Sequence, residues 1–275
     1  MAEAQVYGCF SIGSVAEAYE EIYVPRIFIP WAKLLIERAQ LRPGETVLDV
    51  ATGPGSVARL AAEQVGSSGR VVGTDISAAM VAVAQQKPSL PAAAPIEYLV
   101  APAAPLPVAD GSFDVVLCQQ GLQFFPDCPA AVREMHRALK PEGRLAAAVW
   151  REIALQPSFA AMDAALGECL PAELVQSYGA PFRGLDADGL KALLAEAGFG
   201  EVQAEEHRLP LVYEGGIPQV LATLAASPIA TTVAELDGAT RAKVWAAAER
   251  RLKLLAKDGQ VRAEMVSNIV LAGRR

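Results

Sequence analysis

Residues that serve metal and redox chemistry are scarce in this sequence. Its 275 residues include two histidines and four cysteines, and none of them has metal-site spacing or forms a Cys-x-x-Cys pair. No apolar run approaches the ~20 residues of a membrane span. The chain does not open on a basic segment followed by an apolar one. We therefore expect a cytoplasmic protein with reduced thiols, no metal, no signal peptide and no transmembrane segment.

Positive charge is also in short supply. The 24 lysines and arginines are outnumbered by 31 aspartates and glutamates, which gives a formal net charge of −7. Binding to the phosphates of nucleic acids needs a positive surface, so we expect no nucleic-acid partner. The length suits one large domain or a domain with a lid, and it can bury a substantial core.

The most informative segment covers residues 47–58, with the sequence VLDVATGPGSVA. An apolar run ends, a Gly-x-Gly turn follows, and a helical pattern begins at Ser56. Gly53 and Gly55 can adopt backbone angles that other residues resist, and they let a ligand lie against the main chain. The free N–H groups of the following helix point at the same place. This arrangement predicts a nucleotide-type pocket at the carboxyl end of the first strand of an α/β sheet.

The loop alone leaves two ligands open. Gly53-x-Gly55-x-x-Ala58 fits the dinucleotide fingerprint, and Asp75 lies where an NAD enzyme keeps its ribose-binding acid. However, a helical segment of roughly 45 residues precedes the first strand, whereas many NAD enzymes begin almost at that strand. No Tyr-x-x-x-Lys pair is present in the sequence, which excludes the short-chain dehydrogenase mechanism.

Three more motifs follow the loop in order. They are VVGTDIS at 71–77, DGSFDVV at 110–116 and LKPEGRL at 139–145. With Asp49 four residues before Gly53, the series resembles the class I S-adenosylmethionine (SAM) methyltransferases. It is most similar to the type-11 group that includes the ubiquinone/menaquinone C-methyltransferases. The resemblance covers about residues 40–155.

Alternation of strand and helix patterns predicts an α/β fold with a parallel sheet. We expect strands near 46–51, 70–75, 96–101, 113–119, 143–150, 201–213 and 262–272, and helices near 56–65, 78–86 and 129–139. The resemblance implies a Rossmann-like seven-stranded sheet of order 3-2-1-4-5-7-6 whose last strand is antiparallel. Pro210 cannot donate to a ladder, which suits the sixth strand's place at the sheet edge.

The domain organisation follows from this pattern. Residues 41–213 and 261–275 are expected to form the SAM-binding domain. Residues 1–40 carry the pattern of two helices and are expected to be a helical lid. Residues 214–260 are too long for a hairpin and are expected to be a second helical lid element between the last two strands.

The resemblance implies a cofactor site of ten residues. Asp49 is expected to organise the glycine loop and the cofactor's ammonium group, and Asp75 to accept both ribose hydroxyls, with a helix cap as its alternative role. Ile76 and Met80 would flank the adenine, although both also suit a protein core. The full set is Asp49, Ala51, Gly53, Gly55, Asp75, Ile76, Met80, Pro102, Ala103 and Gln119.

A second set of residues is expected to line the pocket for the methyl acceptor. The glutamines of the fourth strand's loop cannot act as bases near neutral pH, but they can orient an acceptor. The aromatic residues also fit a plain core. The set is Tyr19, Tyr23, Phe28, Trp31, Gln120, Gln123 and Phe124. Gln120, Gln123 and His207 are the candidates for a catalytic role, with a solvated edge position as the alternative for His207.

One position departs from the family pattern. Pro102 replaces the acid that the resemblance predicts after the third strand, and a proline has no backbone N–H. The sequence predicts a SAM-dependent methyltransferase acting on a small, partly apolar molecule. It leaves open a non-methylating reaction on the same fold, such as a cyclisation, and a nonenzymatic SAM-binding protein.

Overall fold

The motif-bearing region builds the parallel part of a mixed sheet in the computed structural model, which describes residues 9–274. Most of its strands are buried and rich in Val, Leu and Ala, as expected for strands covered on both faces, whereas the third, at the sheet edge, is only partly buried. They are β1 (Thr46–Val50), β2 (Arg70–Asp75), β3 (Ile96–Val100), β4 (Phe113–Gln119) and β5 (Leu139–Trp150).

Three further strands complete the sheet. They are β6 (Phe199–Tyr213), β7 (Ala256–Lys257) and β8 (Gln260–Arg274). The order is β3-β2-β1-β4-β5-β8-β6, and β8 runs antiparallel to β5. The predicted order is confirmed, with β8 in the place of the expected seventh strand and Pro210 on the edge strand β6. The two-residue strand β7, which pairs with β8, was not predicted.

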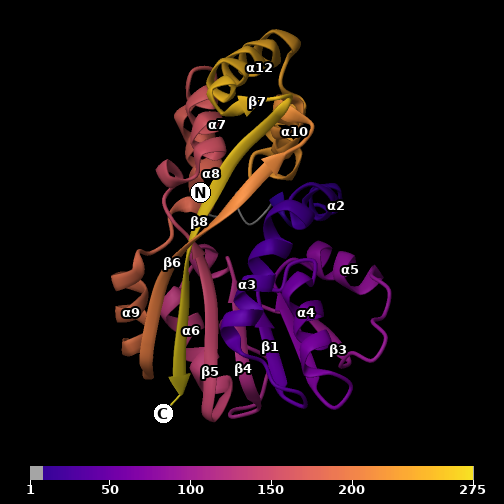
Figure 1. Cartoon of the computed structure of the whole chain (residues 1–275), viewed down its shortest axis with the longest axis vertical. Coiled ribbons are helices and arrows are strands. Elements are labelled where there is room, and N and C mark those ends of the chain that lie inside the picture. The colour runs from indigo at the N-terminus through magenta and orange to yellow at the C-terminus, as the bar shows by residue number, and fades with distance from the viewer. Residues whose placement is uncertain (1–8, 275) are drawn as a thin grey trace. The chain divides into compact units, whose positions relative to one another are not determined.

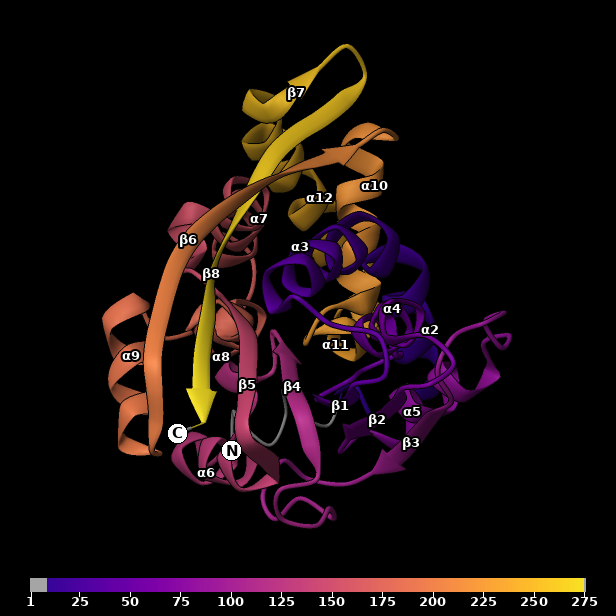
Figure 2. The same cartoon turned by 60° about the horizontal axis from the view of Figure 1, so that its bottom comes forward.

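Helices cover both faces of the sheet (Figure 1). On one face, α3 (Ile29–Ala39) and α4 (Ser56–Val65) bury small apolar side chains against alternate residues of β1, β4 and β5. On the other face, α6 (Cys128–Ala138) and α9 (Ala187–Glu196) bury mostly larger side chains, such as Met135 and Leu190, against the remaining residues of these strands. A fifth helix, α5 (Ala78–Gln86), packs on β2 and β3. Figure 2 shows β5 lying between β4 and β8.

The segment before β1 is helical, as predicted, but it is interrupted. Helix α2 (Gly13–Ile22) is followed by a π-helical turn, η1 (Val24–Phe28), and then by α3. Pro25 has no N–H to donate to the carbonyl one helical turn back, which explains why the α-helical ladder breaks here. π-helical turns are frequent at functional sites.

The chain divides into two compact units. Unit 2 holds residues 28–150, 184–207 and 267–275 and contains all the motifs. Unit 1 holds residues 1–27, 151–183 and 208–266. The first eight residues of the predicted segment 1–40 lie outside the described residues, and residues 28–40 group with unit 2.

Unit 1 is mostly helical, and its core is built around aromatic side chains. Phe159 lies 6.4 Å from Tyr23, 6.4 Å from Tyr178 and 4.8 Å from Phe182 between ring centroids. Residues 214–260 are largely helical, as predicted, whereas the helices of residues 153–182 were not predicted. The helical elements of this unit beyond α2 are η3 (Ile153–Leu155), α7 (Pro157–Gly167), α8 (Ala172–Gly179), η4 (Ala180–Phe182), α10 (Gly216–Ala222), η5 (Thr223–Ala226), α11 (Ala230–Glu235), α12 (Gly238–Leu252) and η6 (Lys253–Leu255). Within residues 9–274, no helix is both long and apolar enough to span a membrane.

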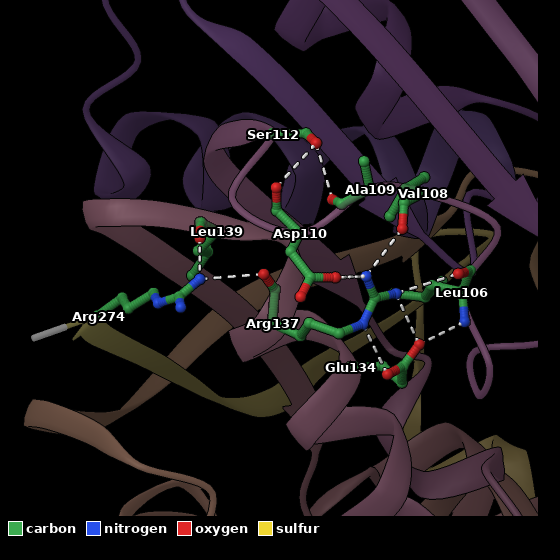
Figure 3. Close-up of polar contacts among 9 residues, drawn as sticks. All are labelled: Leu106, Val108, Ala109, Asp110, Ser112, Glu134, Arg137, Leu139 and Arg274. Carbon is green, nitrogen blue, oxygen red and sulfur yellow. Dashed lines mark hydrogen bonds and ion pairs between the residues drawn. The ribbon is translucent and has the colours of Figure 1, made fainter.

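One arginine of α6 holds the loop between β3 and β4 (Figure 3). Arg137 donates to Leu106 O at 3.1 Å, to Val108 O at 2.8 Å and to Asp110 Oδ1 at 2.6 Å. Glu134 orients the guanidinium from the same helix and also accepts from Leu106 N at 2.7 Å. The Arg137 guanidinium lowers the pKa of Glu134. A planar fork with five donors suits this task of binding several loop carbonyls at once.

The last residues of β8 are fixed to the same region. Arg274 donates from Nη1 to Arg137 O at 3.0 Å and to Leu139 O. The sheet and the β3–β4 loop are therefore held together at the amino end of β5, opposite the edge where the glycine loop lies.

Candidate active site

Three residues with positive φ shape the loop after β1. Ala51 has φ +58°, Gly53 +54° and Gly55 +80°. The loop is closed by Gly55 N donating to Thr52 O at 2.9 Å, and Thr52 N donates to Thr74 O at 2.9 Å. The hydrogen bond to Thr74 fixes the loop to the end of β2.

The two glycines are needed for different reasons. A Cβ added to Gly53 would meet no atom within 4 Å, so its requirement is conformational and its face is open. A Cβ added to Gly55 would lie 2.4 Å from the hydroxyl of Tyr98, a contact that real side chains do not make. Gly73 likewise leaves room for Tyr98 and Thr52, since its Cβ would lie 2.9 Å from each.

Asp75 ties the glycine loop to the start of α5. Its Oδ2 accepts from Gly53 N and its Oδ1 from Ser77 N, each at 2.8 Å. Burial raises the pKa of Asp75, and these two N–H groups oppose that rise. Ser77, and not Asp75, caps α5 by accepting from Met80 N at 3.1 Å. A carboxylate has about four lone-pair sites, so Asp75 keeps acceptor capacity beyond its two main-chain donors.

Asp49 is fully buried at the end of β1. Its Oδ2 accepts from Thr52 Oγ1 at 2.6 Å, and its Oδ1 has no hydrogen-bond partner among residues 9–274. Burial raises the pKa of Asp49 to about 7, and the nearby Asp75 adds to the rise. The hydroxyl of Tyr98, two strands away in the same register, is also buried and unpartnered within the described chain. Burial and the Asp49 charge raise the pKa of Tyr98 to about 12.

One glutamine, Gln119, ends β4, and two more, Gln120 and Gln123, follow it. Gln119 Nε2 donates to Phe28 O at 3.1 Å, and Gln120 Nε2 donates to Ser267 Oγ at 3.0 Å. The side-chain oxygens of Gln119 and Gln120 are buried and find no partner in the described part of the chain. The same holds for both amide atoms of Gln123, in η2 (Leu122–Phe124).

The loops after β1 and β4 touch each other. A Cβ on Gly121 would lie 2.7 Å from the Cβ of Ala51, so the two backbones meet closely. The sheet order reverses at β1 and β4, the place where open α/β sheets bind ligands at their carboxyl edge. Asp49, the glycine loop and the three glutamines are therefore brought together at this edge.

The residues predicted beside the adenine lie in different environments. Ile76 is 65% exposed after β2, whereas Met80 is 4% exposed and packed in the protein interior. Pro102 is exposed after β3, and Ala103 is half-buried against the core. Ala101 N donates to Asp75 O at 2.9 Å, which holds this segment against the end of β2.

The predicted acceptor-lining aromatics are spread over both units. Trp31 is 1% exposed and packs edge-on against Trp150, with ring centroids 5.3 Å apart, while Phe28 lies 6.4 Å from the same ring. In unit 1, Tyr19 packs on Tyr23 at 5.6 Å, and the Tyr23 hydroxyl donates to Thr223 O at 3.1 Å. Phe124 is half-buried in the turn after β4. Trp31 and Tyr23 thus have the contacts of core residues.

His207 lies on the edge strand β6. Its Nε2 is 3.3 Å from Arg38 Nη2 and 3.5 Å from Glu205 Oε2, and Arg38 also pairs with Glu205. Burial and the Arg38 charge lower the pKa of His207. The geometry places this histidine in an ion network at the sheet edge.

Sequence reasoning did not identify Thr52, Tyr98 or Ser267. Tyr98 looks like an ordinary strand residue until Gly73 is known to be its register partner. Ser267 lies outside every motif, and only the β5–β8 pairing brings it to the site. No cluster of three or more His, Cys, Asp or Glu side chains that could hold a metal ion occurs between residues 9 and 274.

Comparisons with known proteins identify the family of the chain. Residues 48–147 match the sequence profile of a family described as "Methyltransferase domain". The chain is 34% identical over 184 residues to the ubiquinone/menaquinone biosynthesis C-methyltransferase UbiE of Enterobacter sp. (strain 638). That alignment covers 63% of this chain and 73% of the relative.

Solved structures share the fold. YcgJ of Bacillus subtilis superimposes with a TM-score of 0.59 at 20% identity, covering 89% of this chain and 97% of that one. The phosphoethanolamine N-methyltransferase 2 of Haemonchus contortus, solved with SAM, gives a TM-score of 0.60 at 18% identity. The superposition covers 96% of this chain and 57% of the Haemonchus chain. The relationship to UbiE shows that the chain belongs to the SAM-dependent methyltransferase family that includes the ubiquinone/menaquinone biosynthesis C-methyltransferases, and the solved structures show the shared fold.

Proposed function

We propose that this SAM-dependent methyltransferase transfers its methyl group to a small, partly apolar molecule held at the carboxyl ends of β1 and β4. The observation that carries the proposal is a group of buried polar atoms at this edge without partners in the described chain. They belong to Asp49, Gln119, Gln120 and Gln123. An unpartnered buried polar atom costs about 1–3 kcal/mol. A ligand that pairs with these atoms would recover that cost.

The residues at this edge fit the cofactor. The open face of Gly53 and the tight turn at Gly55 would let the methionine part lie against the main chain. The free Oδ1 of Asp49 suits an ammonium group, and the remaining lone pairs of Asp75 suit the ribose hydroxyls. Ile76 projects from the end of β2 and offers an apolar surface to one side of the adenine.

The adenine pocket has one weaker element. Pro102 offers neither a carboxylate nor an N–H group, so recognition of the adenine edge would fall to the main chain at Ala103. Ala51, with its positive φ, and Met80, inside the protein, would support the pocket from behind.

Bound SAM supplies a methyl group on a sulfonium, which is already a good leaving centre. The chain therefore needs mainly to align the acceptor and to exclude water. Gln120 and Gln123 would orient the polar atom of the acceptor, and Phe28 and Phe124 would contact its apolar part. A glutamine amide takes no proton near neutral pH, so these residues align the acceptor and do not deprotonate it.

Two further facts support a small-molecule acceptor. The net charge of −7 disfavours nucleic acids. The name of the UbiE relative refers to the biosynthesis of ubiquinone and menaquinone, and both of these compounds are small molecules. A contribution of residues 1–40 and 214–260 to enclosing the acceptor stays a prediction.

The experiment has two stages. Calorimetry should detect binding of SAM and of its demethylated product, with NAD as the control ligand. The protein is then incubated with methyl-labelled SAM and a cell extract of its source organism, and mass spectrometry locates the label. We expect label in a small, organic-extractable product. Binding of NAD in place of SAM, or label confined to RNA or protein, would contradict the proposal.

A further inference from the structure

The side chain of Gln120 is held in one orientation by a short chain of hydrogen bonds. Its Nε2 donates to Ser267 Oγ at 3.0 Å. The Ser267 hydroxyl in turn lies 2.9 Å from Val149 O and 3.2 Å from Asn268 O. Both of these partners are main-chain carbonyls, which can only accept.

These acceptors determine which end of the amide faces which way. A serine hydroxyl has one hydrogen, and here it is given to a main-chain carbonyl. The oxygen of Ser267 therefore accepts from Gln120, which requires the NH₂ end of the amide to face Ser267. The carbonyl oxygen of Gln120 must point the other way.

That carbonyl oxygen is buried and has no hydrogen-bond partner within residues 9–274. Gln120 is only 5% exposed, and its backbone is fixed by φ +55° and by its N–H donating to Ala148 O at 2.8 Å. The molecule thus holds one hydrogen-bond acceptor in a set direction at the point where the sheet order reverses.

The neighbouring groups are poorly suited to satisfy this oxygen. Gln119 uses its NH₂ group on Phe28 O, so its own oxygen is a second fixed acceptor. Asp49 presents an acceptor oxygen as well. Gln123 has an NH₂ group, but that group is itself unpartnered in the described structure and does not reach Gln120. The missing donor is left for a ligand to supply.

We infer that Gln120 selects the methyl acceptor by requiring a hydroxyl or N–H donor at or beside the atom that is methylated, with Ser267 as the positioning residue. The inference rests on the proposed function, because it deals with the acceptor of that same site. A molecule with only carbonyl or ether oxygens at this point would place a hydrogen-bond acceptor against the side-chain oxygen of Gln120, which is also a hydrogen-bond acceptor. Such a mismatch leaves buried groups unpaired and discriminates strongly.

Ser267 lies on β8, which in the sequence is well beyond the family region of residues 48–147. Acceptor choice is thus partly encoded in the last strand and not only in the motif loops.

The first test uses four variants in the labelled-SAM assay on the small-molecule extract. Gln120→Leu removes the hydrogen-bond-accepting oxygen of this side chain and should lower methyl transfer at least tenfold. The affinity for S-adenosylhomocysteine should stay within twofold of wild type. Ser267→Ala frees the amide to rotate and should raise the KM for the acceptor severalfold more than it lowers kcat. Ser267→Thr keeps the hydroxyl and should restore transfer. Ser177→Ala, which removes another buried hydroxyl, bonded to Glu173 O in unit 1, is the control.

The second test examines the donor itself. Hydroxyl groups of the extract are capped as acetate esters and primary amines as phthalimides, so that neither keeps a donor, and one part is then deprotected with hydrazine, which removes both caps. Wild-type transfer should disappear on the capped extract and return after deprotection. Undiminished transfer on the capped extract, or wild-type turnover by Gln120→Leu, would overturn the inference while leaving the proposed function intact. If the wild type labels no small molecule from the untreated extract, the proposed function itself fails, and this inference with it.

Discussion

The polar side chains at the ends of β2 and β4 differ in whether the protein itself supplies hydrogen-bond donors to their oxygens. After β2, both carboxylate oxygens of Asp75 accept main-chain N–H groups, and Ser77 caps the next helix. After β4, the side-chain oxygens of Gln119 and Gln120 are buried without partners in the described chain. Both ends belong to unit 2, so the contrast lies within one packed body.

The contrast separates two tasks that one site must perform. The β2 end is already organised by the protein, which suits a ligand that is always the same. The β4 end holds acceptors whose donors are missing, which suits a ligand that supplies them. Asp49, on the strand between them, has one oxygen bonded to Thr52 and the other without a partner in residues 9–274.

The largest effect is expected from pH acting on Asp49. Its folded-state pKa of about 7 exceeds the 3.8 of an ordinary carboxyl, so the folded protein keeps a proton that the unfolded chain has lost. The free energy of unfolding of the ligand-free protein should therefore fall as pH rises from about 4 to 7. Relative to Asp49→Asn, the decrease should approach ~4 kcal/mol, at ~1.4 kcal/mol per pKa unit. Urea unfolding of both proteins at several pH values measures it.

The comparison with Asp49→Asn removes the contribution of other titrating groups. Tyr98, Asp75 and Cys118 face the same region and are present in both proteins. Parallel curves for the two proteins would show that Asp49 titrates normally and that the β1 end is not electrostatically strained.

Asp75→Ala should disrupt the hydrogen bonds at the end of β2 and weaken SAM binding. The substitution leaves the N–H groups of Gly53 and Ser77 without their partner and removes the proposed acceptor for the ribose hydroxyls. Two charge-assisted hydrogen bonds are worth about 1.5–3 kcal/mol each, so SAM affinity should fall at least ~100-fold. Calorimetry measures the loss, and Asp75→Asn, which keeps one acceptor oxygen, should lose less. Normal SAM binding by Asp75→Ala would place the cofactor elsewhere.

The two glycines should differ in stability when each is changed to alanine. Gly55→Ala combines a positive φ with the 2.4 Å approach to Tyr98 Oη and should cost ~2–3 kcal/mol. Gly53→Ala meets no neighbour and should cost only the backbone term of ~1 kcal/mol. Thermal unfolding compares them, and Tyr98→Leu should recover part of the Gly55→Ala loss. Equal costs for the two variants would mean that the Tyr98 contact has no energetic weight.

Pro102→Asp is expected to raise the affinity for SAM, and this is the smallest of the expected effects. It adds a carboxylate and a backbone N–H at position 102, which the proposed adenine site lacks. One net hydrogen bond contributes about 1 kcal/mol, so SAM affinity should rise ~5-fold. Calorimetry again provides the measurement, with Pro102→Ala as the control that restores only the N–H. Unchanged affinity in a folded Pro102→Asp protein would show that the adenine is recognised without this position.

Much of the sheet was readable from the sequence, for a physical reason. Strand positions follow from short apolar runs such as 46–50, and helix positions from helical patterns such as 56–65 and 129–139, which agree with α4 and α6. The glycine loop was predictable because the positive φ angles at Gly53 and Gly55 favour glycine. Features of this kind depend on residues that are close together in the sequence.

The missing parts depend on contacts distant in sequence. The helices of residues 153–182 carry no motif, and the π-helical turn at Pro25 interrupts a pattern that otherwise reads as continuous helix. The orientation of Gln120 depends on Ser267, which is 147 positions away along the chain. The contact between Tyr98 and Gly55 depends on the register of three strands. No periodicity or spacing records such pairings.

Strand β8 has a consequence for how each molecule is made. It contributes residues 260–266 to unit 1 and 267–274 to unit 2, so neither unit is complete before it is synthesised. About 110 residues separate the end of β5 from the start of β8. At ~5–20 residues per second, the ribosome leaves the apolar edge of β5 without its neighbour for roughly 5–20 s. An unpaired strand edge invites pairing with other chains. Every nascent molecule passes through this exposed state, and a chain that stops before residue 260 never leaves it.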